Sequence, residues 1–310
     1  TFFSIIYVYL GGFTSVVRTD VFQFVLMFVG FAVLLGMLTV TYGGLESLKQ
    51  AVPSSQFTWH GGNSGWYIAT WYFIALATLI EPAFYQRCYA AKNASVAQHG
   101  ILISIVCWAV FDFMTTMCGI YARALLPDLA DPVGSYPALA MQVLPVGMLG
   151  LFTLALLSTV MSTIDSYSFL AASTFGNDIV GRVAKLNDRE ILRYTRFGLI
   201  VSTLLAVVLA LFFRSVVDIW HAFGSIGTPA LLIPVFSSFV GRRRLPARDA
   251  FLSIIVSGGV SLVWFLSQYM TDKGRFWLGI EPIFPGLACS LVLFVLLSKQ
   301  GNAYLLGRKK

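Results

Sequence analysis

Charged residues are scarce in this sequence: Asp, Glu, Lys and Arg make up 11% of the 310 residues, against 57% for hydrophobic residues. A soluble domain usually carries about 25% charged residues. A soluble protein this apolar could not cover its own core with polar surface, whereas a bilayer removes that need. The composition and the mean hydropathy of +0.79 therefore exclude an ordinary soluble domain and predict a membrane protein.

The motifs that mark common enzyme classes are also missing. The sequence contains no Walker motif, no GxGxxG, no HExxH and no GxSxG. Its three histidines, His60, His99 and His221, are far apart. Its four cysteines are scattered in or just after apolar runs, where they are typical of small core residues. Because no nucleophile–base pairing or metal cluster is found in the apolar runs, the sequence predicts that the protein is not an enzyme.

The chain does not begin with Met: it starts at Thr1, inside the apolar run TFFSIIYVYL. The basic n-region and the small-residue cleavage site of a signal peptide are lacking as well. We therefore expect a fragment of a longer membrane protein whose N-terminal part is missing. Residues 1–10 are expected to form the cytoplasmic end of an earlier span.

Long apolar runs dominate what is present. A transmembrane helix needs about 20 consecutive, mostly apolar residues. Eight runs meet this requirement, so the sequence predicts an all-α polytopic membrane protein with eight transmembrane helices plus part of one more. The predicted spans cover residues 21–42, 67–85, 99–121, 145–170, 193–213, 216–240, 249–269 and 282–298.

Basic residues follow these spans. With the loop around Arg18 placed inside the cell and the sides alternating from there, 16 of the 21 Lys and Arg residues lie inside and 5 outside, as the positive-inside rule predicts. The net charge of +7 is then explained by topology and by attraction to anionic inner-leaflet lipid. Nucleic acid is therefore not an expected partner, and the basic C-terminal tail is predicted to be cytoplasmic.

The run 153–178 is unusually rich in hydroxyl groups for an apolar helix. Ala155, Ser158 and Thr159 are spaced i, i+3, i+4, so they share one helix face. Sodium is a hard cation that prefers oxygen ligands, by analogy with calcium and magnesium. The hydroxyls of Ser158 and Thr159, with backbone carbonyls, can supply them. The alternative is that these hydroxyls bond to their own helix or to neighbouring helices.

Asp165 follows in the same run, three residues after Ser162. A carboxylate inside a membrane is costly and is by default a candidate for function. Asp165 either joins a second ion site or carries a proton. The alternatives are an end-of-helix residue wetted from the cytoplasm and a residue paired with a basic side chain.

Glu81-Pro82 interrupts the apolar segment 71–92. Proline removes a backbone hydrogen bond and kinks a helix. Broken helices at membrane depth are tolerated where they line a cavity, and transporters use them to expose backbone to substrate. This pattern places Glu81 toward a cavity; the alternative is a simple kink near a membrane interface.

Glycine and proline also weaken the segment 220–234, WHAFGSIGTPALLIP. Gly224, Gly227, Pro229 and Pro234 make this helix easy to bend. Small residues also permit close helix packing, which is the alternative explanation.

The segment 9–23, YLGGFTSVVRTDVFQ, predicts a turn followed by a helix. Gly11-Gly12 turns the chain, and the stretch from Asp20 to Gln23 is expected to open the helix. Asp20 would then be an acid in the first turn, favoured there by the helix dipole.

Four segments, taken together and in order, resemble the sodium:solute symporter family, which includes proline, pantothenate and glucose transporters. GGFTSVVRTDVFQ is similar to the turn before that family's fifth core helix, and EPAFYQRCYAAKNASVAQHG to the end of its sixth. SYPALAMQVLPVGMLGLFTLALLSTVMSTIDSYSFLAASTFGNDI resembles its longest motif, and PGLACSLVLFVLLS its penultimate or last span.

The resemblance implies a LeuT-type fold, with two inverted five-helix repeats and flanking helices. Residues 1–310 would form a single transmembrane transporter domain in which 67–240 are the second inverted repeat. The chain would also contain the end of the fourth core helix, the whole fifth core helix and two later helices. Core helices one to three would be missing.

The same resemblance implies two sets of site residues. The carbonyl of Ala155 and the hydroxyls of Ser158 and Thr159 match the family's sodium ligands on the eighth core helix, whose partner carbonyls come from the first helix. Asp20 matches an aspartate on the cytoplasmic side of the sodium route, where some members bind a second sodium to which Ser162 could contribute. The residues expected to line the solute cavity are Glu81, Pro82, Ala83, Trp220, Gly224 and Ser225.

Taken together, these features predict sodium-coupled secondary active symport of a small polar organic solute into the cell by alternating access. The protein would lie in the plasma membrane, with Na+ as its coupling ion and the lipid bilayer around it. The Glu81-Pro82 pair is closer to the Gln-Pro of the proline-transporter type than to the polar amide of sugar transporters. The alternatives are a transporter-like sensor domain and a proton-coupled carrier that uses Asp165 or Glu81.

Overall fold

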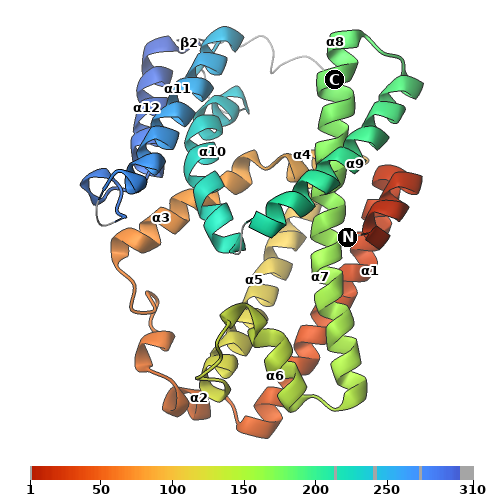
Figure 1. The fold of residues 1–310 in the computed structure, drawn as a ribbon, viewed down its shortest axis with the longest axis vertical. Coiled ribbons are helices and arrows are strands. Elements are labelled where there is room, and N and C mark those ends of the chain that lie inside the picture. Colours follow the sequence, from red (N-terminus) through yellow and green to blue (C-terminus); the bar gives the residue numbers. More distant parts are fainter. Residues whose placement is uncertain (1, 213–214, 240–242, 272–273, 301–310) are drawn as a thin grey trace. The chain divides into compact units, whose positions relative to one another are not determined.

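The computed structural model describes residues 2–212, 215–239, 243–271 and 274–300. Nearly all of this chain is helical (Figure 1). It forms two compact units, of which the first comprises Thr1–Gly62 with Tyr85–Ala210 and the second Asn63–Phe84 with Leu211–Lys310. The predicted C-terminal tail, residues 301–310, lies outside the described residues.

The described helices confirm the predicted spans. Seven are long and apolar enough to cross a membrane, and α12 (Ile283–Leu297), which matches the predicted run 282–298, is a shorter apolar helix. The seven are Phe3–Tyr42, Gly65–Ala90, Ala94–Leu125, Val146–Ala184, Asp188–Leu211, Val216–Phe239 and Ala247–Tyr269.

Helix α1 (Phe2–Tyr42) bends at Gly12, where φ is 56° and ψ is −147°. This left-handed backbone conformation favours glycine, so the predicted turn at Gly11-Gly12 is confirmed. The prediction that Asp20 opens the following helix is wrong. Nothing in the sequence FTSVVRT after Gly12 breaks a helix, so the helix is already formed there, and Asp20 lies about two turns inside it.

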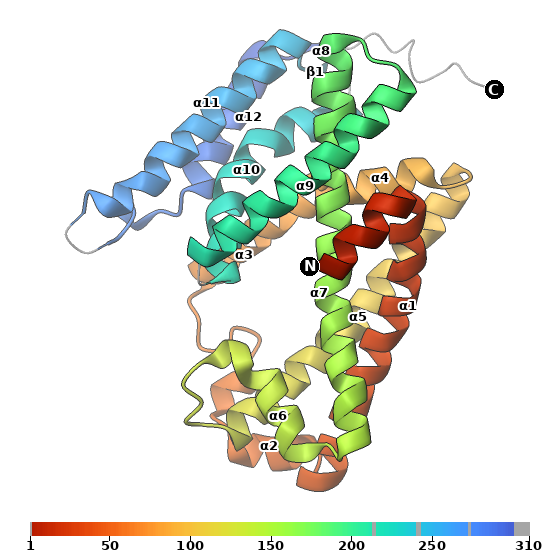
Figure 2. The same cartoon turned by 45° about the vertical axis from the view of Figure 1, so that its right-hand side comes forward.

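The first unit is built on the packing of α1 along α7 (Val146–Ser173) and α5 (Ala94–Leu125), and α1 and α7 lie side by side in Figures 1 and 2. Phe31 of α1 is at the centre of its core, because its ring packs edge-on against Phe111, Tyr136 and Phe152 at centroid distances of 5.2, 5.4 and 5.2 Å. The remaining elements of this unit are α2 (Leu45–Ala51), η1 (Ser54–Phe57), η3 (Pro132–Gly134), α6 (Ser135–Val143), η4 (Thr174–Gly181), α8 (Arg182–Ala184) and α9 (Asp188–Phe212).

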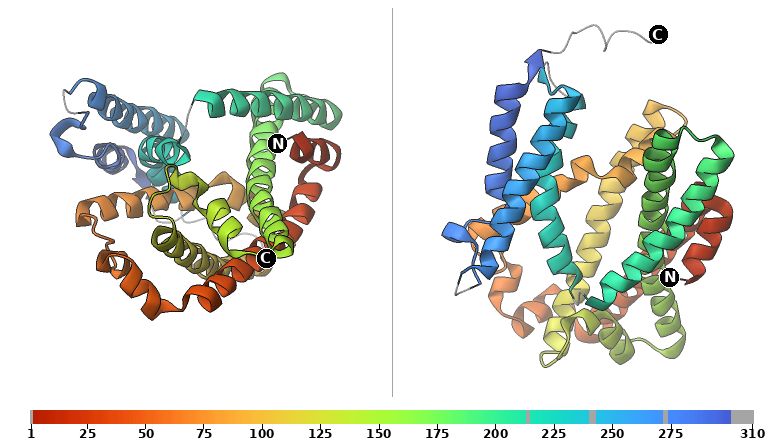
Figure 3. Two further views of the ribbon diagram at one scale, coloured as in Figure 1. Left: turned by 60° about the horizontal axis from the view of Figure 1, so that its bottom comes forward. Right: turned by 45° about the horizontal axis from the view of Figure 1, so that its top comes forward.

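The second unit is built on α10 (Val216–Phe239), α11 (Ala247–Leu266) and α12, which pack against one another (Figure 3). Helices α11 and α12 approach closely, because a Cβ atom on Gly286 would lie 1.8 Å from Oγ of Ser261. The other elements are α3 (Gly65–Ala75), η2 (Leu76–Ile80), η5 (Ser267–Tyr269), η6 (Trp277–Gly279) and the two-residue strands β1 (Arg243–Arg244) and β2 (Lys299–Gln300), which pair antiparallel. Helix α4 (Pro82–Ala90) includes the boundary between the two units.

We predict that Gly30→Ala destabilises the protein by about 1–3 kcal/mol, the usual cost of overpacking. A Cβ atom on Gly30 of α1 would lie 2.2 Å from the Cβ atom of Ala155 of α7, so the two helices would have to separate. Gly36→Ala is the matched control, because nothing lies within 4 Å of a Cβ atom built there. Thermal unfolding of the purified protein in detergent measures both, and equal midpoints for the two variants would contradict the packing.

Candidate functional site

Three of the predicted sodium ligands lie on one turn of α7, where Ala155 and Ser158 are buried and Thr159 is partly exposed. The side chain of Ala155 is fully buried and packs against Gly30 of α1, and Ser158 is 6% exposed. The hydroxyl of Thr159 donates to the carbonyl oxygen of Ala155 at 3.0 Å, which is the bond to its own helix that was the alternative explanation. A carbonyl oxygen has a second lone pair, so this bond leaves acceptor capacity at Ala155. Sodium binding here stays a prediction.

Asp20 and Ser162 meet directly, although they are 142 residues apart in sequence. The hydroxyl of Ser162 donates to Oδ1 of Asp20 at 2.9 Å. Arg87 of α4 completes the group: its Nη2 lies 2.8 Å from Oδ2 of Asp20 and donates to Oγ of Ser166 at 2.7 Å. The Asp20 and Arg87 side chains are 20% and 36% exposed, so Asp20 is a partly buried, paired carboxylate and not an acid at a helix start.

Asp165 is fully buried and is held by residues of α1. The phenol of Tyr7 donates to its Oδ2, and Nε2 of Gln23 lies 3.5 Å from the same oxygen. No ion pair formed within the described part of the chain includes Asp165. The burial contradicts the alternative of a cytoplasmically wetted end, and the alternative of a basic partner finds no such partner among the described residues.

The helix is broken at Glu81, as predicted. Helix η2 ends at Ile80, α4 begins at Pro82, and Glu81 between them has extended backbone with φ −69° and ψ 114°. Oε1 of Glu81 accepts from the backbone N–H of Ala83 at 3.4 Å, and so faces the first turn of α4. The break therefore follows from the sequence, whereas the role of Glu81, Pro82 and Ala83 in a cavity stays a prediction.

The predicted cavity residues of α10 differ in exposure. Trp220 is 58% exposed, and its ring lies 6.1 Å from that of Trp71 of α3. Gly224 packs against Ile74, because a Cβ atom on it would lie 2.9 Å from Cγ2 of Ile74, which supports the packing explanation for this glycine. Ser225 is fully buried, and its Oγ has no hydrogen-bond partner among the residues that the structure describes.

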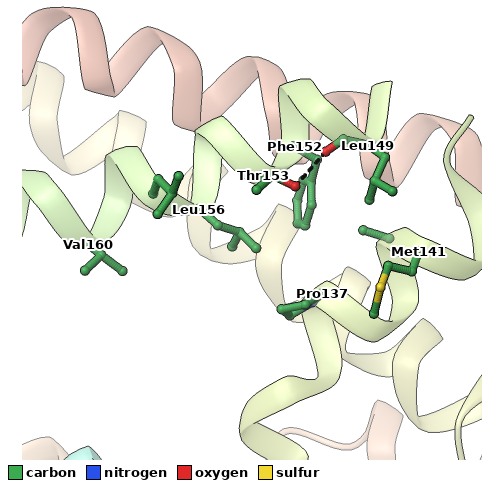
Figure 4. Close-up of a pocket in the computed structure, with 9 residues that line it drawn as sticks. Pro137, Met141, Leu149, Phe152, Thr153, Leu156 and Val160 are labelled. Atoms are coloured by element: carbon green, nitrogen blue, oxygen red, sulfur yellow. Dashed lines mark hydrogen bonds between the residues drawn. The ribbon is translucent and has the colours of Figure 1, made fainter. Parts of the chain in front are cut away.

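A cavity of about 370 Å³ lies on another side of α7, toward α6 (Figure 4). Its wall is almost wholly apolar, and the hydroxyl of Thr153 donates to the carbonyl of Leu149 at 2.8 Å. None of the predicted sodium or solute residues lines it, so it is separate from the candidate site. The lining residues are Pro137, Ala140, Met141, Leu149, Phe152, Thr153, Leu156, Leu157 and Val160.

Sequence reasoning missed three contacts in this region. None of Arg87, Tyr7 and Gln23 is among the site residues predicted from the sequence. The sequence does contain signals for them: a basic residue follows a broken apolar helix, and a phenol and an amide lie within apolar runs. Their partners could not be identified, because Tyr7 and Asp165 are 158 residues apart.

Comparisons with known proteins agree on one family. The sequence model of the sodium:solute symporter family matches residues 1–258. The sodium/pantothenate symporter of Haemophilus influenzae is 26% identical over 310 residues, which cover 96% of this chain and 62% of that protein. The sodium/sialic acid symporter of Aliivibrio fischeri is 27% identical, over 89% of this chain and 59% of its own. The chain thus spans about three fifths of the length of these relatives.

A solved structure gives the same fold. It is a Na+-coupled sialic acid symporter in a substrate-bound, outward-open state, 20% identical in sequence, with a TM-score of 0.70 over 96% of this chain and 66% of that one. This likeness confirms the predicted all-α, LeuT-type transporter fold.

We predict that Asp20→Asn and Arg87→Gln are non-additive in the free energy of unfolding. Each single variant leaves a partly buried charge without its partner. The double variant should therefore lose less unfolding free energy than the two single variants added together, and we expect this difference, the coupling free energy, to be about 0.5–3 kcal/mol. The exposed pair Glu46–Lys49 is the control, because a double-mutant cycle on such a pair gives about 0.2–1 kcal/mol. A coupling free energy at Asp20–Arg87 no larger than that of the control would contradict a partly buried ion pair.

Proposed function

Because this chain belongs to the sodium:solute symporter family, we propose that the protein is a sodium-coupled symporter that moves a small polar organic solute into the cell by alternating access. The observation that carries the proposal is the contact of α1 with the hydroxyl-rich stretch of α7. Within the residues that match the family, this contact brings the Asp20 carboxylate against Ser162, one turn from Ser158 and Thr159. No observation favours a sensor domain, a proton-coupled carrier or an enzyme over this function.

Sodium is proposed to bind through oxygen atoms of α7. The carbonyl of Ala155 and the hydroxyls of Ser158 and Thr159 are hard oxygen donors of the kind that such cations prefer. Two of the three are nearly removed from water, because Ala155 is fully buried and Ser158 is 6% exposed, and this strengthens their attraction for a cation. Other segments of the whole protein would complete the coordination.

Asp20 and Ser162 are proposed to form the cytoplasmic part of the sodium route. In the present structure Arg87 lies 2.8 Å from the Asp20 carboxylate and already supplies a positive charge there. Because Na+ and a guanidinium group repel each other, a sodium ion on Asp20 and the Arg87 contact would weaken one another. Exchange of one cation for the other at Asp20 would therefore accompany the passage of sodium.

The solute is proposed only as a class. The relatives are named for pantothenate, for sialic acid and, in the sodium/myo-inositol cotransporter 2 of Mus musculus, for myo-inositol; all three are small polar organic molecules. We propose that the broken helix exposes backbone groups to the solute, as in other transporters, and that the buried Ser225 hydroxyl is available to it. The full set of proposed cavity residues is Glu81, Pro82, Ala83, Trp220, Gly224 and Ser225.

Coupling is proposed to follow the general scheme of secondary transport. Bound sodium raises the affinity for solute by a coupling free energy of about 1–3 kcal/mol. The membrane potential contributes about 2.3 kcal/mol per charge per 100 mV to the driving force. The two inverted repeats rock against each other and so expose the site to one side of the membrane and then to the other; residues 67–240 are proposed to be the second repeat. The protein lies in the plasma membrane as a multi-pass protein, with its C-terminus proposed to be cytoplasmic.

Uptake into proteoliposomes by the whole protein tests the sodium assignment. A panel of amino acids, carboxylates, sugars and vitamins is offered with an inward sodium gradient and a potassium control. Thr159→Ala is expected to raise the sodium concentration for half-maximal uptake about 5- to 150-fold, if the lost ligand contributes about 1–3 kcal/mol. Thr163→Ala is the matched control, because Thr163 is exposed and its hydroxyl donates to the Thr159 carbonyl at 3.1 Å. Uptake that is equal in sodium and in potassium, and equal in the wild type and in Thr159→Ala, would overturn the proposal.

Cysteine labelling tests the proposed orientation. In a variant without the four native cysteines, Thr58→Cys in the predicted outer loop should react with a membrane-impermeant maleimide in intact cells. Gln300→Cys, beside the C-terminal tail, should react only after the membrane is permeabilised. Labelling of Gln300→Cys in intact cells would place the C-terminus outside.

A further inference from the structure

The buried carboxyl group of Asp165 is not needed for the sodium and solute residues proposed above. Its side chain is fully buried inside a membrane-spanning helix. Its two oxygens differ: Oδ2 accepts from the Tyr7 phenol and lies 3.5 Å from Nε2 of Gln23, whereas Oδ1 has no hydrogen-bond partner in the described part of the chain. Asp20, by contrast, contacts Ser162 and Arg87, so the two carboxyl groups have no partner in common.

No charge in the described surroundings neutralises Asp165. The titratable groups that α1 presents to it are Tyr7, which donates a hydrogen bond, and Asp20, which has the same sign of charge. Arg87 of α4 is engaged by Asp20 and Ser166, and Arg196 of α9 lies over the ring of Tyr9, 4.9 Å from its centroid. An ionised carboxylate buried without a positive partner costs several kcal/mol.

Oxygen atoms beside Asp165 can accept a further hydrogen bond. Gln23, which touches Asp165, is 5% exposed, and its Oε1 has no hydrogen-bond partner among the described residues. Ser4 of α1 is fully buried, and its Oγ is likewise unpartnered there. The cavity on α7 is lined by other residues. A proton needs no cavity. It converts one carboxyl oxygen from an acceptor into a donor, in a region where the acceptor Oε1 of Gln23 has no partner among the described residues.

We propose that Asp165 is a proton-binding site within the membrane-spanning part of the first unit, protonated while α1 and α7 are packed as in this structure. The neutral carboxyl group removes the charge penalty of burial and the repulsion from Asp20. Ionisation would favour conformations in which water reaches this part of the α1–α7 contact. The proposal does not depend on which ion or solute the protein transports.

Infrared difference spectroscopy tests it without any transport assay. The whole protein in lipid vesicles is titrated with pH, and the spectrum of Asp165→Asn is subtracted from that of the wild type. We expect a C=O stretching band of a protonated carboxyl group at neutral pH that Asp165→Asn removes. Asp112→Asn, the same change at an exposed position of α5, should leave that band in place.

Two results would overturn the proposal. One is the absence of any Asp165-specific band over the whole pH range in which the protein stays folded. The other is a band that appears only when sodium is replaced by choline, since sodium would then be the ligand that neutralises Asp165. Neither result depends on measured symport, so a failure here is distinguishable from a failure of the proposed function.

Tyr7→Phe provides a second variant that keeps the carboxyl group. Tyr7 is a positioning residue whose hydroxyl donates to Oδ2, and such a bond favours the ionised form of a carboxyl group. Its removal should therefore extend the protonated band to higher pH than in the wild type. A band that disappears at lower pH in Tyr7→Phe would contradict the arrangement.

Discussion

The close contact between α1 and α7 is the constraint on which the chemistry of the first unit depends. Gly30 has no side chain, so α1 can approach Ala155 closely enough that a Cβ atom on residue 30 would overlap it. Along the same pair of helices, Asp20 contacts Ser162, and Tyr7 and Gln23 contact Asp165. Two carboxyl groups, separated by 145 positions in the sequence, therefore share one helix pair but have different partners.

The partners give the two carboxyl groups different properties. Asp20 is partly exposed and compensated by a guanidinium group, so it is suited to exchange one cation for another. Asp165 is fully buried and has only neutral hydrogen-bond donors, so it is suited to hold a proton. In a membrane the cost of an uncompensated charge makes this difference decisive.

Local features of this structure could be predicted from the sequence, and long-range contacts could not. The apolar runs, the turn at Gly11-Gly12 and the break at Glu81-Pro82 depend on neighbouring residues alone, and all are present. The prediction that a helix begins at Asp20 was wrong, because no residue between Gly12 and Asp20 ends a helix. The Arg87–Asp20 pair joins residues 67 positions apart, and no periodicity in either segment encodes it.

The most direct test of this account is a double-mutant cycle on sodium activation of uptake, with Asp20→Asn, Ser162→Ala and the combination in the whole protein. If α1 and α7 form one ion site through these residues, the two changes are non-additive, with a coupling of about 0.5–3 kcal/mol in apparent sodium affinity. If the effects add within about 0.3–0.5 kcal/mol, Asp20 and Ser162 act independently and the central claim is wrong.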